Sequence, residues 1–211
     1  MRLTHLSLTN YRAFSRLDMD VPGRILLLQG NNAQGKTSLL EAIYFFSTFT
    51  SIQASSDRQL INFATIDQNL CVARMVAEIE RENKTFKLEV RLILEKNNGN
   101  ENARFRKEIL LDGVRRSAQQ AVTSFNAVIF LPQMTRIIEG GPDERRRYLN
   151  LALAQVIPGY AQALSEYNQI LGQRNALLKQ LAEGRSDQTL LDYWDRLLTE
   201  RSVLIQQARS Q

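Results

Sequence analysis

The sequence has very little cysteine and histidine. Among its 211 residues, Cys71 is the only cysteine and His5 the only histidine. One cysteine cannot form an intramolecular disulfide, so the composition fits a reducing compartment. A zinc site of Cys/His type cannot be built from two such residues, and a histidine-based triad would depend on His5 alone. Cys71 lies in the apolar run of residues 70–73, which predicts a small, buried side chain.

Long apolar runs are also missing. No window approaches the roughly 18 apolar residues of a membrane span, and the N-terminus has no stretch typical of a signal peptide. We therefore expect a cytoplasmic protein with no membrane partner. The 27 Lys and Arg residues exceed the 22 Asp and Glu residues, for a formal charge of +5. This excess permits a polyanionic partner and is equally compatible with a solvated basic surface.

The first part of the chain has the pattern of an α/β domain. Residues 24–29 (RILLLQ) form a continuous apolar run, typical of a strand buried on both faces, and lead directly into Gly30. Residues 127–131 (AVIFL) predict another buried strand. Residues 37–46 predict a helix, with an apolar side at Leu39, Leu40, Ile43 and Phe46. Mainly alternating apolar residues predict further strands at residues 3–8, 14–21, 70–79, 86–94 and 105–111.

Glycine and proline mark the turns. Asp-Gly at residues 112–113 predicts a tight turn, and the polar residues 97–102 (NNGNEN) predict a loop. Gly-Gly-Pro at residues 140–142 marks a change to a helical pattern that continues almost to the last residue. Pro142 suits the first turn of a helix.

The helical part predicts a hairpin. Residues 160–181 and 190–208 both carry apolar side chains at helical spacing, and the two patterns mirror each other across a turn at residues 184–187. In this register Arg174 faces Arg201, a like-charge pair that needs a nearby carboxylate or solvent. The alternative is two amphipathic helices that lie on the core.

Residues 30–37 carry the complete pattern Gly-x4-Gly-Lys-Thr. Glycines at its ends let backbone N–H groups approach a phosphate closely, because side chains there would block the anion. Lys36 supplies a cation to the β- and γ-phosphates, the Thr37 hydroxyl is placed for Mg²⁺, and the following helix points its positive end at the anion. The pattern therefore predicts ATP and Mg²⁺ as cofactors, and an unliganded glycine-rich turn is the alternative. The candidate binding residues of the loop are Gly30, Asn31, Asn32, Ala33, Gln34, Gly35, Lys36, Thr37 and Ser38.

Hydrolysis needs a further acidic residue at the end of a buried strand. Asp112 comes nearest, but the Asp-Gly sequence there is better explained as a hairpin turn. The chain also has no Leu-Ser-Gly-Gly-like sequence and no histidine after His5. It therefore carries only part of a catalytic site.

Several longer motifs resemble those of chromosome and repair ATPases. Residues 6–14 (LSLTNYRAF) and 30–43 (GNNAQGKTSLLEAI) resemble the ABC-type heads of SMC, RecN and RecF proteins alike. Residues 130–133 (FLPQ) and 140–149 (GGPDERRRYL) are similar to RecF in particular. The hairpin adds the RecF-like residues Tyr167-Asn168, Leu171, Gln173-Arg174-Asn175, Leu177-Leu178, Trp194-Asp195 and Leu198.

This resemblance implies an α/β fold: a P-loop ABC-type ATPase head lobe, with a mixed β-sheet around the P-loop helix and an antiparallel β subregion, plus an antiparallel helical hairpin arm. RecF proteins bind DNA near single-strand gaps, dimerise on ATP, and help RecA loading with RecO and RecR. By position, Lys36 and Gln133 are the candidate catalytic residues, Thr37 and Gln133 the Mg²⁺ contacts, and Arg12 a second phosphate contact. RecF proteins usually have an acidic residue where this chain has Gln133.

RecF proteins also continue well beyond Gln211, and their signature motif, Walker B acid and D-loop lie in that later part. We therefore expect a head lobe at residues 1–140 and an arm at residues 141–211, truncated before its return to the head. The alternatives are the head of an SMC-like or overcoming-lysogenization-defect ATPase, or a protein-interaction module that nucleotide orders. An SMC arm would continue for hundreds of residues, whereas this one turns back at Gly184, and the nuclease would carry acidic metal sites downstream.

Two basic clusters are candidate DNA contacts. Residues 145–147 are three arginines, which could instead pair with Asp143 and Glu144. The second cluster, which could instead protect a sheet edge, comprises Arg104, Arg106, Lys107, Arg115 and Arg116. No base-reading motif is present, so we expect any DNA binding to depend on shape and phosphate and to weaken strongly with salt.

We predict that the 211-residue chain hydrolyses ATP very slowly or not at all, because it lacks the acidic residue and the signature motif. Phosphate release by the purified chain with Mg²⁺ measures this, and the Lys36→Ala variant gives the background. Robust turnover above that background would show that residues 1–211 contain an overlooked catalytic acid.

Overall fold

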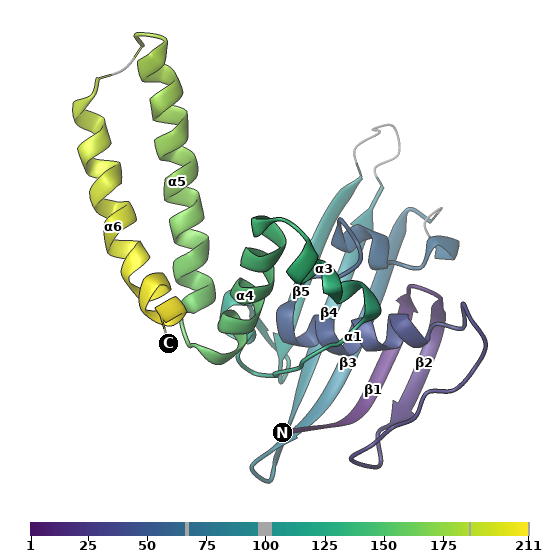
Figure 1. The fold of residues 1–211 in the computed structure, drawn as a ribbon. Coiled ribbons are helices and arrows are strands. Elements are labelled where there is room, and N and C mark those ends of the chain that lie inside the picture. The colour runs from purple at the N-terminus through teal and green to yellow at the C-terminus, as the bar shows by residue number, and fades with distance from the viewer. Residues whose placement is uncertain (66–67, 97–102, 186, 211) are drawn as a thin grey trace. The chain divides into compact units, whose positions relative to one another are not determined.

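The computed structural model describes residues 1–65, 68–96, 103–185 and 187–210 (Figure 1). The chain forms two compact units, unit 1 at Met1–Met134 and unit 2 at Thr135–Gln211. The predicted loop at residues 97–102 lies outside the described residues. In the described part of the chain, no helix is long and apolar enough to cross a membrane.

Unit 1 is built on a six-stranded sheet in the order β2-β1-β3-β4-β5-β6. Its strands are β1 (Arg2–Tyr11), β2 (Phe14–Asp20), β3 (Leu70–Arg81), β4 (Lys84–Glu95), β5 (Arg104–Leu111) and β6 (Val114–Arg116). Every neighbouring pair in this order is antiparallel. The five strands that we predicted from alternating residues are therefore confirmed, because alternation places one apolar face of each strand toward the core.

Tight turns join the central strands. Asp112 and Gly113 connect β5 to β6 with φ angles of 48° and 78°. Positive φ at both central residues matches the right-handed twist of the flanking strands, so the predicted turn is confirmed. Glu82 and Asn83 join β3 to β4 in the same way, with φ angles of 50° and 61°.

The helix α1 (Lys36–Thr48) confirms the helix predicted after the glycine loop. Its Phe45 and Phe46 are fully buried, and the Lys107 ammonium of β5 lies 5.5 Å from the centre of the Phe45 ring. The predicted apolar side was only partly correct. Leu40 is 40% exposed, whereas Glu41 is buried. The helix therefore carries a charged group into the interior of unit 1, and that group needs a partner.

Two predicted strands are not formed. Residues 24–29 and 127–131 belong to no strand pair within the described residues. A strand buried on both faces needs a neighbour along its edge and a cover on each face, and the described chain supplies neither. Four of their large apolar side chains face solvent, with exposed fractions of 91% at Ile25, 83% at Leu27, 93% at Val128 and 87% at Phe130, whereas Leu131 is buried.

Short helical segments complete unit 1 and its junction with unit 2. They are η1 (Asp57–Leu60), η2 (Phe63–Thr65), α2 (Ala118–Ala121) and η3 (Pro132–Thr135). Ser117 caps α2 through a capping box, in which the Ser117 hydroxyl accepts from the Gln120 N–H and the Gln120 amide oxygen accepts from the Ser117 N–H. This reciprocal pair satisfies two N–H groups that the helix start would otherwise leave unpaired.

Unit 2 is helical. It contains α3 (Arg136–Glu139), α4 (Pro142–Val156), α5 (Tyr160–Ala182) and α6 (Thr189–Ser210). Helices α5 and α6 run antiparallel as a hairpin, as Figure 1 shows, and Pro142 occupies the first turn of α4 as predicted.

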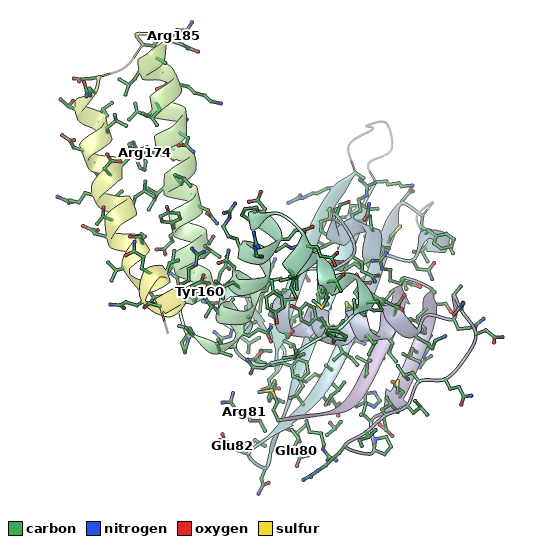
Figure 2. All side chains as sticks on the ribbon, viewed as in Figure 1. Glu80, Arg81, Glu82, Tyr160, Arg174 and Arg185 are labelled. Carbon is green, nitrogen blue, oxygen red and sulfur yellow. The ribbon has the colours of Figure 1, made fainter. Side chains whose placement is uncertain are left out.

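Carboxylates neutralise the two arginines of the hairpin. Arg174, labelled between the helices in Figure 2, donates from Nε to Asp195, and Arg201 Nε lies 3.1 Å from a Glu166 carboxylate oxygen. The requirement that we predicted for a nearby carboxylate is therefore confirmed. Arg174 lowers the pKa of Asp195 mainly through this hydrogen bond.

We predict a raised pKa for His5, whose ring lies between two aspartates of β2. Its Nδ1 is 2.7 Å from Asp20 Oδ1 and its Nε2 is 2.9 Å from Asp18 Oδ1. The hydrogen bond to Asp20 is the largest cause that raises the pKa of His5 above 6.5. Protonated His5 therefore contributes stability that is fully present below pH 6.5 and is lost as the pH rises through the folded pKa.

A proton NMR titration tests this directly, because the chain contains no other histidine. The midpoint should lie above 6.5 and fall in the Asp20→Asn variant, whereas Asp112→Asn, in the turn between β5 and β6, should leave it unchanged. A midpoint at or below 6.5 in the unmodified chain would contradict the two-aspartate clamp.

Candidate nucleotide-binding site

The phosphate loop at residues 30–37 leads directly into α1. Gly35 has a φ of +88°, and a Cβ there would lie 2.8 Å from the Phe14 ring. The backbone angle strains any other residue at this position, and a Cβ there would also have to displace the Phe14 ring, so glycine is strongly favoured. The loop is therefore bent over the turn between β1 and β2.

The loop and the start of α1 enclose a cleft of about 220 Å³. Gly35 caps α1 without a side-chain hydrogen bond, so the N–H groups of the first helical turn are not occupied by a capping side chain. These groups and the helix dipole favour an anion at this position. The lining residues are Ala13, Asn32, Ala33, Gln34, Gly35, Lys36, Thr37 and Ser38.

Lys36 is held against its own loop. Its Nζ donates to the carbonyl oxygens of Gly30, at 2.6 Å, and Asn31, at 2.5 Å. These acceptors are neutral, whereas phosphate oxygens are charged and would accept from the ammonium more strongly. Thr37 lines the same cleft, so the cleft has both a lysine and a hydroxyl residue, the combination that binds a phosphate and its Mg²⁺.

Arg12 forms a buried ion pair. Its Nε and Nη2 donate to the two carboxylate oxygens of Glu41, at 3.0 and 2.9 Å. Glu41 is only 1% exposed, and the Ser51 hydroxyl donates to it at 2.5 Å. The guanidinium is thus engaged by α1, and Arg12 is not among the residues that line the cleft. Its role as a second phosphate contact stays a prediction.

The ion pair connects three elements around the phosphate loop. The Arg12 N–H donates to the Leu60 carbonyl at the end of η1, while its side chain reaches α1. Tyr11 is fully buried beside the pair, and burial raises the pKa of its hydroxyl, so it stays neutral. Sequence reasoning missed Glu41 and Ser51 as members of this network. The available signal was a lone carboxylate among the apolar residues of α1.

The remaining candidates are Gln133 and the basic residues of β5. Gln133 belongs to η3, and its side chain lies outside the described residues, so its catalytic and Mg²⁺ roles stay predictions. Lys107 binds the Phe49 carbonyl and Asp57, both at 2.6 Å, and so faces the interior of unit 1. Arg106 lies 3.0 Å from Glu95. The basic strip is therefore partly neutralised by unit 1 itself.

The bent loop, the ammonium and the helix start together define a P-loop nucleotide-binding domain. The chain belongs to the AAA ATPase domain family, whose model matches residues 1–181.

More specifically, the chain is similar to RecF proteins. It is 36% identical to the DNA replication and repair protein RecF of Roseiflexus castenholzii over 209 residues. This alignment covers 94% of this chain and 52% of that protein. It is 34% identical to RecF of Herpetosiphon aurantiacus over 217 residues, and this alignment covers 99% of this chain and 56% of that protein. The chain thus spans about half the length of the curated relatives that it matches.

Solved structures agree with these relatives. The recombination mediator protein RecF of the RecFOR pathway, in its RecF-ATP structure, matches 99% of this chain and 52% of that chain, with a TM-score of 0.82 and 30% identity. A second RecF structure, with the ATP analogue ATPrS, matches equally well, with a TM-score of 0.82. The predicted RecF resemblance and the predicted fold class are confirmed.

We predict that Arg12→Ala lowers the free energy of unfolding by about 3 kcal/mol, because it leaves the buried Glu41 carboxylate without its cation. The matched control is Arg74→Ala. Arg74 also makes a two-pronged ion pair, with Glu89 at 2.8 and 3.0 Å, but Arg91 Nε donates to the same carboxylate at 2.7 Å. Glu89 therefore keeps a cation, and we expect a loss of only about 1 kcal/mol.

Urea denaturation of both variants measures the difference. Equal losses would contradict the argument that Arg12 is the essential cation for Glu41.

Proposed function

We propose that the chain binds MgATP at the phosphate loop. The main supporting observation is the cleft at Gly35. Lys36 and Thr37 line this cleft at the start of α1, where the helix N–H groups are free of a capping side chain. Its volume of about 220 Å³ suits a polyphosphate tail and leaves the nucleoside outside. The RecF-ATP structure, which matches 99% of the chain, supports ATP as the nucleotide.

We further propose that the chain is the ATP-binding part of a RecF-type protein of DNA recombination and repair. This rests on 34–36% identity to two RecF proteins over 94–99% of the chain. In this proposal the whole protein binds DNA near single-strand gaps, dimerises under the control of ATP, and helps RecA loading with RecO and RecR.

The apolar segments at residues 24–29 and 127–131 fit this proposal. Both lie outside the sheet and expose large apolar side chains, such as Ile25 and Val128, that neighbouring strands would cover. A RecF-length polypeptide is nearly twice as long as this chain and has enough residues to supply those neighbours. The same part of such a polypeptide would carry the Walker B acid and the signature motif, so efficient hydrolysis belongs to the longer protein.

Two other functions are less well supported. An SMC-like or overcoming-lysogenization-defect ATPase would share the phosphate loop, but the similarity here extends into the hairpin and is to RecF proteins. A protein-interaction module ordered by nucleotide would bind ATP without DNA-dependent turnover. Single-turnover hydrolysis by a RecF-length version, with and without gapped DNA, separates that module from a DNA-controlled ATPase.

We predict that Lys36→Ala weakens MgATP binding by about 100-fold or more, because it removes the only lysine among the described residues that line the cleft. Isothermal titration calorimetry of the 211-residue chain measures the affinity. The control is Lys84→Ala, an exposed lysine at the start of β4. Unchanged affinity in Lys36→Ala would reject the phosphate-loop assignment, and a similar loss in Lys84→Ala would show a non-specific charge effect.

A further inference from the structure

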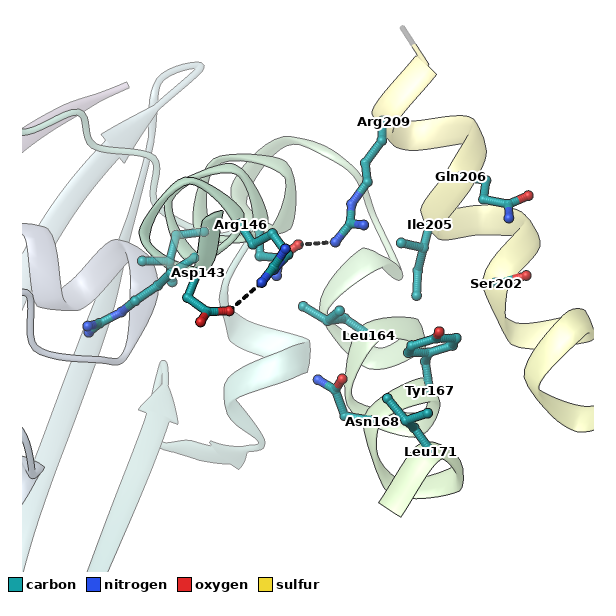
Figure 3. Close-up of a pocket in the computed structure, with 13 residues that line it drawn as sticks. Asp143, Arg146, Leu164, Tyr167, Asn168, Leu171, Ser202, Ile205, Gln206 and Arg209 are labelled. Atoms are coloured by element: carbon teal, nitrogen blue, oxygen red, sulfur yellow. Dashed lines mark hydrogen bonds and ion pairs between the residues drawn. The ribbon is translucent and has the colours of Figure 1, made fainter. Parts of the chain in front are cut away.

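A second, larger cleft lies entirely within unit 2. Helices α4, α5 and α6 all contribute side chains to it, and its volume is about 630 Å³ (Figure 3). This is the size range of small-molecule sites, and it exceeds the volume of the phosphate-loop cleft.

The cleft has an excess of positive charge. Arg146, Arg147 and Arg209 line it, and Asp143 is the only acidic residue among its described lining residues. Arg146 Nη2 donates to Asp143, but the Asp143 side chain is 93% exposed, so water weakens this ion pair. Arg146 and Arg209 therefore offer two cationic groups to an anion in the cleft, and Asp143 competes only weakly for one of them.

Arg209 is held in place by neutral groups. Its Nη2 donates to Asn150 Oδ1 at 2.9 Å, and the Tyr160 hydroxyl donates to the same oxygen at 2.7 Å. Tyr160 is fully buried, so this arrangement is anchored in the core of unit 2. Figure 3 shows Arg146 and Arg209 reaching the cleft from α4 and α6. Planar guanidinium groups presented from two helices suit the oxygens of a phosphate.

The opposite part of the cleft is apolar and aromatic. Leu164, Tyr167 and Leu171 project from α5, as Figure 3 shows, and Ile205 adds a buried aliphatic group from α6. Tyr167 is half-buried, so part of its side chain stays accessible. Asn168 supplies an amide that both donates and accepts hydrogen bonds. An aromatic ring beside amides and aliphatic groups suits a nucleobase, whose face stacks and whose edge forms hydrogen bonds.

We propose that this cleft binds a nucleoside phosphate, with the phosphate at Arg146 and Arg209 and the base against Tyr167. The group can come from a free nucleotide or from one nucleotide of a single DNA strand. Only the DNA source rests on the proposed function. The site is separate from the phosphate loop, because all of its lining residues belong to unit 2 and all of the loop's belong to unit 1.

The test uses the 211-residue chain with Lys36→Ala and without Mg²⁺, so that the phosphate loop does not contribute. Fluorescence anisotropy of a fluorescein-labelled dT12 strand measures binding of a DNA strand, and calorimetry with AMP measures binding of a free nucleotide. We expect Arg146→Glu and Arg209→Glu to weaken binding of the bound probe at least tenfold. The charge control is Arg196→Glu, on a 77% exposed side chain of α6 outside the cleft.

The contribution of the base is tested separately. Tyr167→Ala should weaken binding, whereas Tyr193→Ala, on a 57% exposed side chain of α6, should not. Circular dichroism melting checks the fold of each variant. If Arg209→Glu unfolds unit 2, Arg146→Glu still decides the question, because Arg146 pairs with the exposed Asp143 and its loss leaves no buried charge.

Binding of either probe that depends on Arg146 and Tyr167 supports the proposal and identifies the source. Three results overturn it: neither probe binds, Arg196→Glu weakens binding as much as Arg146→Glu, or a labelled oligoglutamate peptide binds more tightly than both probes. A failure of MgATP binding in the chain with Lys36 intact would reject the phosphate-loop site and leave this result unaffected.

Discussion

The phosphate loop packs closely against the sheet where Gly35 meets Phe14. Any Cβ at position 35 would lie 2.8 Å from the aromatic ring, so the loop rests directly on the turn between β1 and β2. The same turn supplies Arg12, whose ion pair with Glu41 holds α1 further along its length. One turn of the sheet therefore supports both the anion-binding bend and the helix whose dipole the anion meets. The cleft therefore depends on the turn between β1 and β2 as well as on the glycine motif of the loop.

Local patterns were sufficient for most of unit 1. The glycine spacing of the loop, the Asp-Gly turn and the alternation of the strands each depend on a few neighbouring residues, and each agrees with the structure. Residues 24–29 and 127–131 show the limit of such reasoning. An apolar run indicates that a segment is suited to burial, but burial also needs neighbouring strands, and the described chain does not provide them.

Side-chain pairing was the least predictable level. Arg12 and Glu41 are 29 positions apart, and no sequence period relates them. Composition could show that α1 carries a carboxylate and that the hairpin needs one near Arg174, but only the fold identified Arg12 and Asp195 as the partners. The arginine cleft of unit 2 was hidden for the same reason, because three helices contribute to it and each alone has an ordinary mixed surface.

The exposed apolar segments of unit 1 also affect how molecules of this chain associate with one another. Val128 and Phe130 form one exposed apolar surface, and Ile25 and Leu27 form another. A molecule with two separate apolar surfaces can bind two other copies of itself. Association through two different surfaces does not close into a dimer and continues by addition of further molecules. We therefore expect turbidity that increases with protein concentration, and no oligomer of defined size.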